Sequence, residues 1–385
     1  MIPLVDLAAQ HREIASEVAA GFASVIERAA FVGGSEIADF ERELAAFVGV
    51  DHCVAVANGT DAVELALRAA GVGAGDEVIV PVNTFAATAL AVVRAGAVPV
   101  FADCDPEYLL LDPAAVRIGP RTRALVPVHL FGQMAPIAAL AAAAPGALLI
   151  EDAAQAHGAS QDGAPVGTRS VAAATSFYPG KNLGAYGDGG AVLTSSGAVA
   201  ERIRALRNYG SDVKYHHPML GMNSRLDTLQ AVVLRAKLKR LAAWNEARQA
   251  AARRYDELLA DLGDDVALPR TAPGNTHVRH LYCVRVRDAA RAPGGAARVP
   301  VADAERARRR DGVLARLVAA GIGAGVHYPV PLHLQGAFAY LGHRRGDFPV
   351  AEGAADELLS LPLFPHITAA QQEEVVAALR KALRG

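Results

Sequence analysis

Short apolar runs alternate with alanine-rich stretches along the first half of this 385-residue chain. Each run has the length and composition of a buried strand, and most stretches between runs are long enough for a helix. Strands and helices that alternate in this way form a parallel sheet with helices on both faces. We therefore expect an α/β fold with a mostly parallel seven-stranded sheet between helices. The runs cover residues 53–57, 77–80, 98–102, 124–128, 148–150, 174–177 and 191–194.

The rest of the chain has a different order of elements. A helical pattern runs with little break from about residue 228 to about residue 262, which is longer than most globular helices. A strand-like run at 280–286, a helical stretch at 313–320 and a final helix follow. The chain is also longer than one hydrophobic core usually serves. We expect a large domain at residues 1–245, a smaller α+β domain at 246–385, and the long helix as a bridge.

Lys181 lies in a glycine-rich turn between the last two apolar runs. The turn fails the P-loop pattern, because Thr175 stands where the first glycine belongs and Asn182 replaces the magnesium-binding hydroxyl. It also lacks the G-x-G-x-x-G spacing of a dinucleotide site. A lysine with few charges nearby suits Schiff-base chemistry, which needs an unprotonated amine. An ordinary surface lysine is the alternative, and the turn alone does not separate the two.

Asp152 falls at the carboxyl end of the predicted strand 148–150, where open α/β sheets bind their ligands. The alternative role for Asp152 is a helix N-cap. A strand-end aspartate together with Lys181 favours pyridoxal phosphate as cofactor. The lysine would form an imine with it, and the carboxylate would keep the pyridine nitrogen protonated.

Residues 54–63 cross from a strand into a helix and form a candidate phosphate site. Gly59 lets the backbone approach a ligand, Thr60 supplies a hydroxyl, and the helix start offers free amides and a positive dipole end. A capped helix that binds nothing is the alternative.

Two segments resemble the signatures of the DegT/StrS-type nucleotide-sugar aminotransferases. They are residues 151–158 (EDAAQAHG) and 176–190 (SFYPGKNLGAYGDGG), and the resemblance extends from residues 2–7 to residues 361–365. It implies fold type I of the enzymes that use pyridoxal phosphate. It also implies pyridoxamine phosphate as an intermediate and L-glutamate as amino donor.

The resemblance implies a role for each remaining candidate residue. Ser176 would join Gly59 and Thr60 at the cofactor phosphate. Phe85 would lie over the pyridine ring, although a core phenylalanine is the competing interpretation. Gln155 would bond the phenolic oxygen, whereas His157 could equally be structural. Asn223 would reach the phosphate of a neighbouring subunit, so that a homodimer shares its active sites; a helix cap is its alternative role.

The segments 177–180 (FYPG) and 327–335 (HYPVPLHLQ) are most similar to members that aminate the C3 ketone of a dTDP-linked 6-deoxyhexose. The expected product is a dTDP-3-amino-3,6-dideoxyhexose, made in deoxyaminosugar biosynthesis. A 4-keto nucleotide sugar, a cyclitol ketone such as an inosose, and a non-catalytic regulator on the same fold stay open. A dehydratase variant of the family lacks the lysine, so Lys181 argues against it. Arg279, where an aromatic residue is common, and an insertion at 289–301 depart from the pattern.

Composition excludes several classes of partner. The net charge of −2 gives no sign of nucleic-acid binding. No apolar run is long enough to span a membrane. The three cysteines form no C-x-x-C pair, which argues for a reducing compartment and against a zinc site. We expect a cytoplasmic protein without a metal, and we interpret the arginine-rich stretch 306–310 as a solvated helix face.

Overall fold

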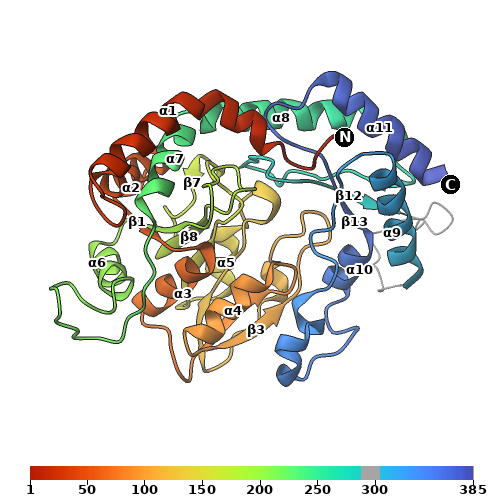
Figure 1. The fold of residues 1–385 in the computed structure, drawn as a ribbon. Coiled ribbons are helices and arrows are strands. Elements are labelled where there is room, and N and C mark those ends of the chain that lie inside the picture. The colour runs from red at the N-terminus through yellow and green to blue at the C-terminus, as the bar shows by residue number, and fades with distance from the viewer. Residues whose placement is uncertain (288–303, 385) are drawn as a thin grey trace.

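A seven-stranded sheet forms the centre of the molecule, with the strand order β1-β9-β8-β5-β4-β2-β3 (Figure 1). The computed structural model describes residues 1–287 and 304–384, so the insertion predicted at 289–301 lies outside the described residues. β9 is antiparallel to both of its neighbours, and the other neighbouring pairs are parallel. The predicted α/β fold with a mostly parallel seven-stranded sheet is therefore confirmed. The strands are β1 His52–Val56, β2 Glu77–Pro81, β3 Val98–Ala102, β4 Thr122–Leu125, β5 Leu148–Asp152, β8 Ala172–Ser176 and β9 Gly190–Thr194.

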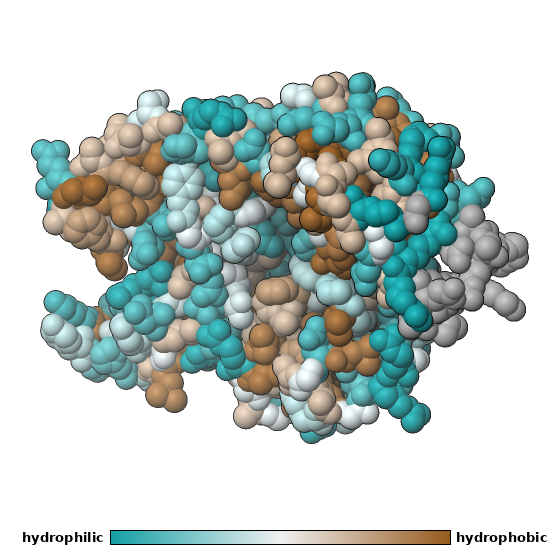
Figure 2. All heavy atoms as spheres, turned by 45° about the vertical axis from the view of Figure 1, so that its right-hand side comes forward, coloured by the Kyte–Doolittle hydropathy of each residue, from teal (hydrophilic) through white to brown (hydrophobic). Residues whose placement is uncertain are grey.

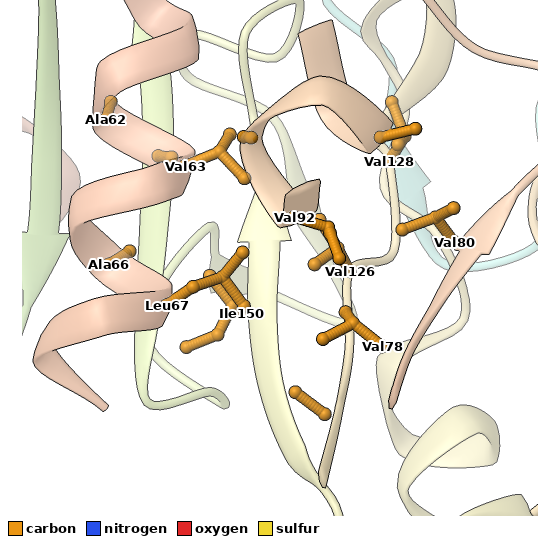
Figure 3. Packing of buried hydrophobic residues seen from close by; sticks show 14 of the residues in the cluster. Ala62, Val63, Ala66, Leu67, Val78, Val80, Val92, Val126, Val128 and Ile150 are labelled. Carbon is orange, nitrogen blue, oxygen red and sulfur yellow. The ribbon is translucent and has the colours of Figure 1, made fainter. Parts of the chain in front are cut away.

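Helices cover both faces of this sheet. Alternate side chains of a strand point to opposite faces, so Val78 and Val80 of β2 pack on one face and Ile79 packs on the other. Figure 3 shows Val63 and Leu67 of α3 on the Val78 face, with Val92 of α4 beside them. The Val78 face is covered by α3 Gly59–Ala69, α4 Ala86–Arg94 and α6 Gly197–Leu206; the Ile79 face is covered by α2 Ser35–Val48, α5 Ile137–Ala143 and α7 Thr228–Leu238.

The long bridging helix predicted from about 228 to about 262 is wrong. The chain instead forms α7, then α8 Leu241–Leu258, then a short 3-10 turn at Ala260–Leu262. The break lies at Lys239 and Arg240, where a guanidinium N–H of Arg240 donates to Ala236 O at 2.7 Å and so caps α7. The two helices pack in different cores, α7 on the large sheet and under α1 Leu7–Glu27, and α8 on the C-terminal core. Tertiary packing thus interrupts a pattern that is locally helical throughout.

A smaller three-stranded sheet with helices packed around it, α8 among them, forms the C-terminal part (Figure 1). α8 runs across the predicted domain boundary at 245–246, so no loop marks the boundary there. The division into domains at this position stays a prediction. The N-terminus also reaches this part, since Ile2 bridges Ile322 and packs in its core. Its elements are β10 Val266–Ala267, β12 Tyr282–Val286, β13 Leu358–Leu361, α9 Ala304–Ala319, α10 Pro349–Glu357 and α11 Ala369–Arg384. A third small sheet joins β6 Ser160–Gln161, β7 Ala164–Pro165 and β11 Asn275–Thr276.

The arginine-rich stretch 306–310 lies in α9, and the prediction of a solvated face is correct only in part: Arg308 is exposed, whereas the end of the stretch is not. Arg310 is buried, and one of its guanidinium nitrogens donates to Ala355 O at 2.8 Å and to Leu358 O at 2.9 Å. These carbonyls lie at the end of α10, where helix carbonyls lack partners of their own. Arg310 therefore joins α9 to α10. Within the described ranges, no helix combines the length and apolar character that crossing a membrane requires.

Candidate active site

Three of the predicted site residues meet at one edge of the large sheet because the strands that carry them run in the same direction. β1 and β8 are both antiparallel to β9, and β5 is parallel to β8. Asp152 and Ser176 are the last residues of β5 and β8, and Gly59 follows β1. The carboxyl edge of such a sheet is where α/β proteins bind ligands.

Lys181 lies in the loop from β8 to β9, at the same edge. The loop folds back on itself, since the N–H of Lys181 donates to Tyr178 O at 2.8 Å and that of Ala185 donates to Phe177 O at 2.7 Å. Gly184 is required there, because a Cβ at this position would lie 2.3 Å from Pro179 O. Loss of hydration lowers the pKa of Lys181 to about 8, and the charge of nearby Asp152 partly opposes this shift. The amine therefore exists in both protonation states near neutral pH.

Asp152 is buried, and two donors fix the direction of its carboxylate. The Thr88 hydroxyl donates to Oδ2 at 2.7 Å, and the N–H of Ala154 donates to Oδ1 at 3.1 Å. The helix N-cap considered for Asp152 is wrong, because turns rather than a helix follow β5. Thr88 was missed by the sequence analysis. It lies three residues after Phe85, and residues three apart share one face of a helix. This spacing could have indicated that Thr88 faces the same site as Phe85.

A chain of contacts joins Gln155 to Phe85. The backbone N–H of Phe131 donates to Gln155 Oε1 at 2.6 Å, so the amide group of Gln155 directs its NH2 the other way, to the Tyr328 hydroxyl at 3.1 Å. The Tyr328 ring lies 5.6 Å from the exposed ring of Phe85, between centroids. Phe85 is thus not a core residue. Tyr328 belongs to the site, although its sequence motif gave no sign of this contact.

The start of α3 and the end of β8 form a narrow cradle. Asn58 caps the helix by accepting the N–H of Asp61 at 2.8 Å. Among the described residues, the backbone N–H groups of Gly59 and Thr60 have no acceptor. A Cβ on Gly59 would lie 2.6 Å from the Cβ of Ser176. Free amides at a helix start, beside a serine and with no room for a side chain, suit a phosphate group.

Two further sequence candidates take no part in the contacts described so far. His157 is buried, and its Nε2 lies 2.8 Å from the Thr175 hydroxyl, which agrees with the structural interpretation. Asn223 is exposed at the base of the hairpin 208–223, where it bridges Asn208. The next residue, Ser224, accepts the N–H of Ala57 at 3.1 Å, so Asn223 lies near the α3 start of its own chain.

Comparison with known proteins places this arrangement in one family. A model of the DegT/DnrJ/EryC1/StrS aminotransferase family matches residues 12–380. The chain belongs to this family. The resemblance found in the sequence motifs is thereby confirmed, as is an aminotransferase as the class of enzyme.

Individual relatives of this aminotransferase are similar over most or all of their length. The dTDP-3-amino-3,4,6-trideoxy-alpha-D-glucose transaminase of Streptomyces venezuelae is 45% identical, over 99% of this chain and 96% of the relative. The crystal structure of S. venezuelae DesV with a ketimine intermediate has a TM-score of 0.91 at 44% identity, over 100% and 99% of the two chains. That of Bacillus subtilis NtdA with bound cofactor PMP has a TM-score of 0.86 at 28% identity, over 99% and 83%.

The cradle of this aminotransferase can be tested by filling it. Gly59→Ala places a methyl group against Ser176, and we expect overpacking to cost about 1–3 kcal/mol of the free energy of unfolding. Gly263→Ala is the matched control, because a Cβ there meets nothing within 4 Å and φ is −54°. Thermal unfolding of both variants measures the difference. Equal stability of the two would contradict the tight approach of Gly59 to Ser176.

The amine of Lys181 should titrate below an ordinary lysine. Trace labelling with acetic anhydride across pH, followed by peptide mass spectrometry, measures the fraction of neutral amine. We expect the labelling rate at Lys181 to reach half its plateau at pH about 8. Asp152→Asn should move this midpoint to lower pH, because the carboxylate charge raises the pKa of Lys181. A midpoint near the ordinary value of about 10.4 would show that Lys181 is not desolvated.

Proposed function

We propose that this chain transfers an amino group from L-glutamate to a nucleotide-linked keto sugar with pyridoxal phosphate as cofactor. The proposed substrate is a dTDP-linked 3-keto-6-deoxyhexose, and the product is the dTDP-3-amino-3,6-dideoxyhexose. The observation that carries the proposal is the meeting of Lys181, Asp152 and the cradle of Gly59 and Ser176 at one edge of the sheet, where burial also lowers the pKa of Lys181. The activity for which the S. venezuelae relative is named supports both the dTDP carrier and the C3 position.

The described side chains fit the proposed cofactor group by group. Gly59, Thr60 and Ser176 would hold its phosphate in the cradle. Asp152 would face the ring nitrogen with the carboxylate sites that Thr88 and Ala154 leave free. Gln155 has only its NH2 group to offer, which matches an acceptor such as the phenolic oxygen. Phe85 would cover one face of the ring, and the PMP-bound neighbour supports the same cofactor.

The chemistry then divides between cofactor and protein. Pyridoxal phosphate, when bound, supplies an aldehyde that exchanges for an amine and a ring that withdraws electrons. Lys181 moves the proton: with a pKa of about 8 its amine can take a proton from the carbon of the donor and return one to the carbon of the acceptor. Over both halves glutamate becomes 2-oxoglutarate and the ketone becomes an amine, so the atoms balance without another reactant.

The proposal is tested by supplying the purified protein with pyridoxal phosphate, L-glutamate and a keto substrate. With the dTDP-linked 3-keto sugar as substrate, mass spectrometry should find the amino sugar and an equal amount of 2-oxoglutarate. A 4-keto nucleotide sugar and an inosose serve as parallel substrates. Faster turnover of either would replace the assigned substrate. No turnover of any of them, with cofactor bound, would favour the non-catalytic regulator.

We also propose that the functional unit is a homodimer. The hairpin 208–223 projects from the body, at the lower left of Figure 1, and exposes large apolar side chains. Tyr215 is 85% exposed and Leu220 is 89% exposed. A recess beside the hairpin, seen at the left of Figure 2, has Val32, Ile37 and Met219 among its lining residues. A second copy of the chain would cover these surfaces.

Whether the sites are shared can be decided by complementation. A Lys181→Ala chain is mixed with an Asn223→Ala chain, and subunit exchange is confirmed by mass. If the partner subunit's Asn223 completes each site, the mixed dimer holds one site with both defects and one with neither, and activity rises above that of either variant. If Asn223→Ala alone is impaired and no activity returns, Asn223 acts at the active site of its own subunit, beside the start of α3.

A further inference from the structure

Asn182 follows Lys181 in the chain, and its side chain is buried at the junction of three segments. Its Nδ2 donates to Asn245 Oδ1 on α8 at 2.9 Å and to the backbone oxygen of Val278 at 3.0 Å. A backbone carbonyl can only accept, so Val278 fixes which end of the amide carries the hydrogens. Both N–H groups of Asn182 are therefore committed.

The oxygen end of Asn182 faces a histidine. His280 Nδ1 lies 3.1 Å from Asn182 Oδ1, and an amide oxygen can only accept, so Nδ1 of His280 carries the proton. Burial lowers the pKa of His280 well below its ordinary value, and the charge of Lys181 lowers it further. His280 is thus a neutral imidazole with one defined tautomer, close enough to Lys181 to be affected by its charge.

The segment that carries Val278 and His280 is itself anchored at the site. The N–H of Val278 donates to Gly132 O at 2.8 Å, and that of His280 donates to Phe131 O at 2.9 Å. Phe131 is also the residue whose N–H orients Gln155. Gly132 has a φ of 108°, and a Cβ there would lie 2.8 Å from the nitrogen of His280. The approach is therefore close and leaves little freedom.

We infer that Asn182 is a positioning residue for Lys181. The three hydrogen bonds of its side-chain amide join the lysine loop to α8 and to the segment 278–280. The inference rests on the proposed function, in which the amine of Lys181 must meet a reacting carbon. Lysine has a flexible side chain, so the backbone that carries it needs an anchor of this kind. The bond of Lys181 N–H to Tyr178 O holds one side of the loop, and the amide of Asn182 holds the other.

Substitutions at His280 separate this role from direct chemistry. In His280→Asn, the side-chain NH2 occupies the place of Nδ1 and can still donate to Asn182, whereas His280→Gln offers its NH2 at the place of Nε2. We expect His280→Asn to keep kcat within about threefold of the wild type. We expect His280→Gln and Asn182→Ala to lower kcat by about 10²-fold, the scale of a misplacement near 1 Å, with the KM for the keto sugar little changed.

A second readout needs neither cofactor nor substrate. Labelling of Lys181 by acetic anhydride should show a shifted pH midpoint in Asn182→Ala and His280→Gln and an unshifted one in His280→Asn. Unchanged kcat and midpoint in Asn182→Ala would overturn the inference. So would a His280→Asn variant as impaired as His280→Gln, because Nε2 would then act itself. If Asn182→Ala does not fold, the two His280 variants still decide. A wild-type protein that does not transaminate would instead contradict the proposed function.

Discussion

Lys181→Ala should lose transamination almost completely while the protein stays folded. The proposed role of the amine is to move the proton between the reacting carbons, and positioned acid–base groups contribute about 10²–10⁴-fold to a rate. We expect kcat to fall by about 10⁴-fold, the upper end of that range, because covalent attachment of the cofactor is lost with it. Single-turnover kinetics with L-glutamate and with the keto sugar measure the two halves separately.

Lys237 provides a matched control for this experiment. It is buried, and loss of hydration lowers its pKa to about 8, as for Lys181. It lies on α7 over the ring of Tyr186, at 5.1 Å, and we give it no part in the chemistry. Lys237→Met should keep kcat. Borohydride reduction of the wild type in the presence of pyridoxal phosphate should leave the pyridoxyl group on the Lys181 peptide. Its appearance on the Lys237 peptide would contradict the assignment of Lys181.

The residues predicted from sequence share one property: short local motifs identify them. Asp152 ends an apolar run and Lys181 sits in a glycine turn, so strand order alone brings both to one edge of the sheet. Gly59 and Ser176 lie at the same edge because their strands also end there, although the role of Ser176 was implied only by the family resemblance. Their assigned roles remain proposals, but their convergence is a consequence of parallel strands.

The residues that the sequence did not reveal depend on contacts between distant segments. Tyr328 meets Gln155 across 173 positions of the chain, and His280 meets Asn182 across 98. Nothing in the local pattern of either segment encodes the partner. The break between α7 and α8 has a similar cause, because Lys239 and Arg240 are good helix formers and only packing into two cores separates the helices. The burial of Arg310 was not predicted because a run of arginines is typical of an exposed helix face. The carbonyls at the end of α10 that accept its hydrogen bonds belong to a distant segment.

Asp152→Asn should retain the shape of the site and lose most of its activity. The amide can accept the N–H of Ala154 through its oxygen and donate its NH2 to the Thr88 hydroxyl, but it carries no charge to pair with the ring nitrogen of the proposed cofactor. We expect the rate of each half-reaction to fall by about 10³-fold, equivalent to about 4 kcal/mol of transition-state stabilisation. Cofactor affinity should fall much less, since the cradle at Gly59 and Ser176 is untouched. Rapid-mixing spectroscopy gives the rates, and equilibrium titration gives the affinity.

Thr88→Val separates the charge of Asp152 from its orientation. Valine has nearly the shape of threonine, so the variant removes the 2.7 Å hydrogen bond to Oδ2 and leaves the carboxylate and its bond from Ala154 in place. A hydrogen bond to a charged group contributes about 1.5–3 kcal/mol, so the rate should fall by about 10–150-fold, less than in Asp152→Asn. The expected order of rates is wild type, then Thr88→Val, then Asp152→Asn. Near-normal turnover of Asp152→Asn would show that the charge of Asp152 is not needed for the reaction. A Thr88→Val variant as slow as Asp152→Asn would mean that orientation matters as much as charge.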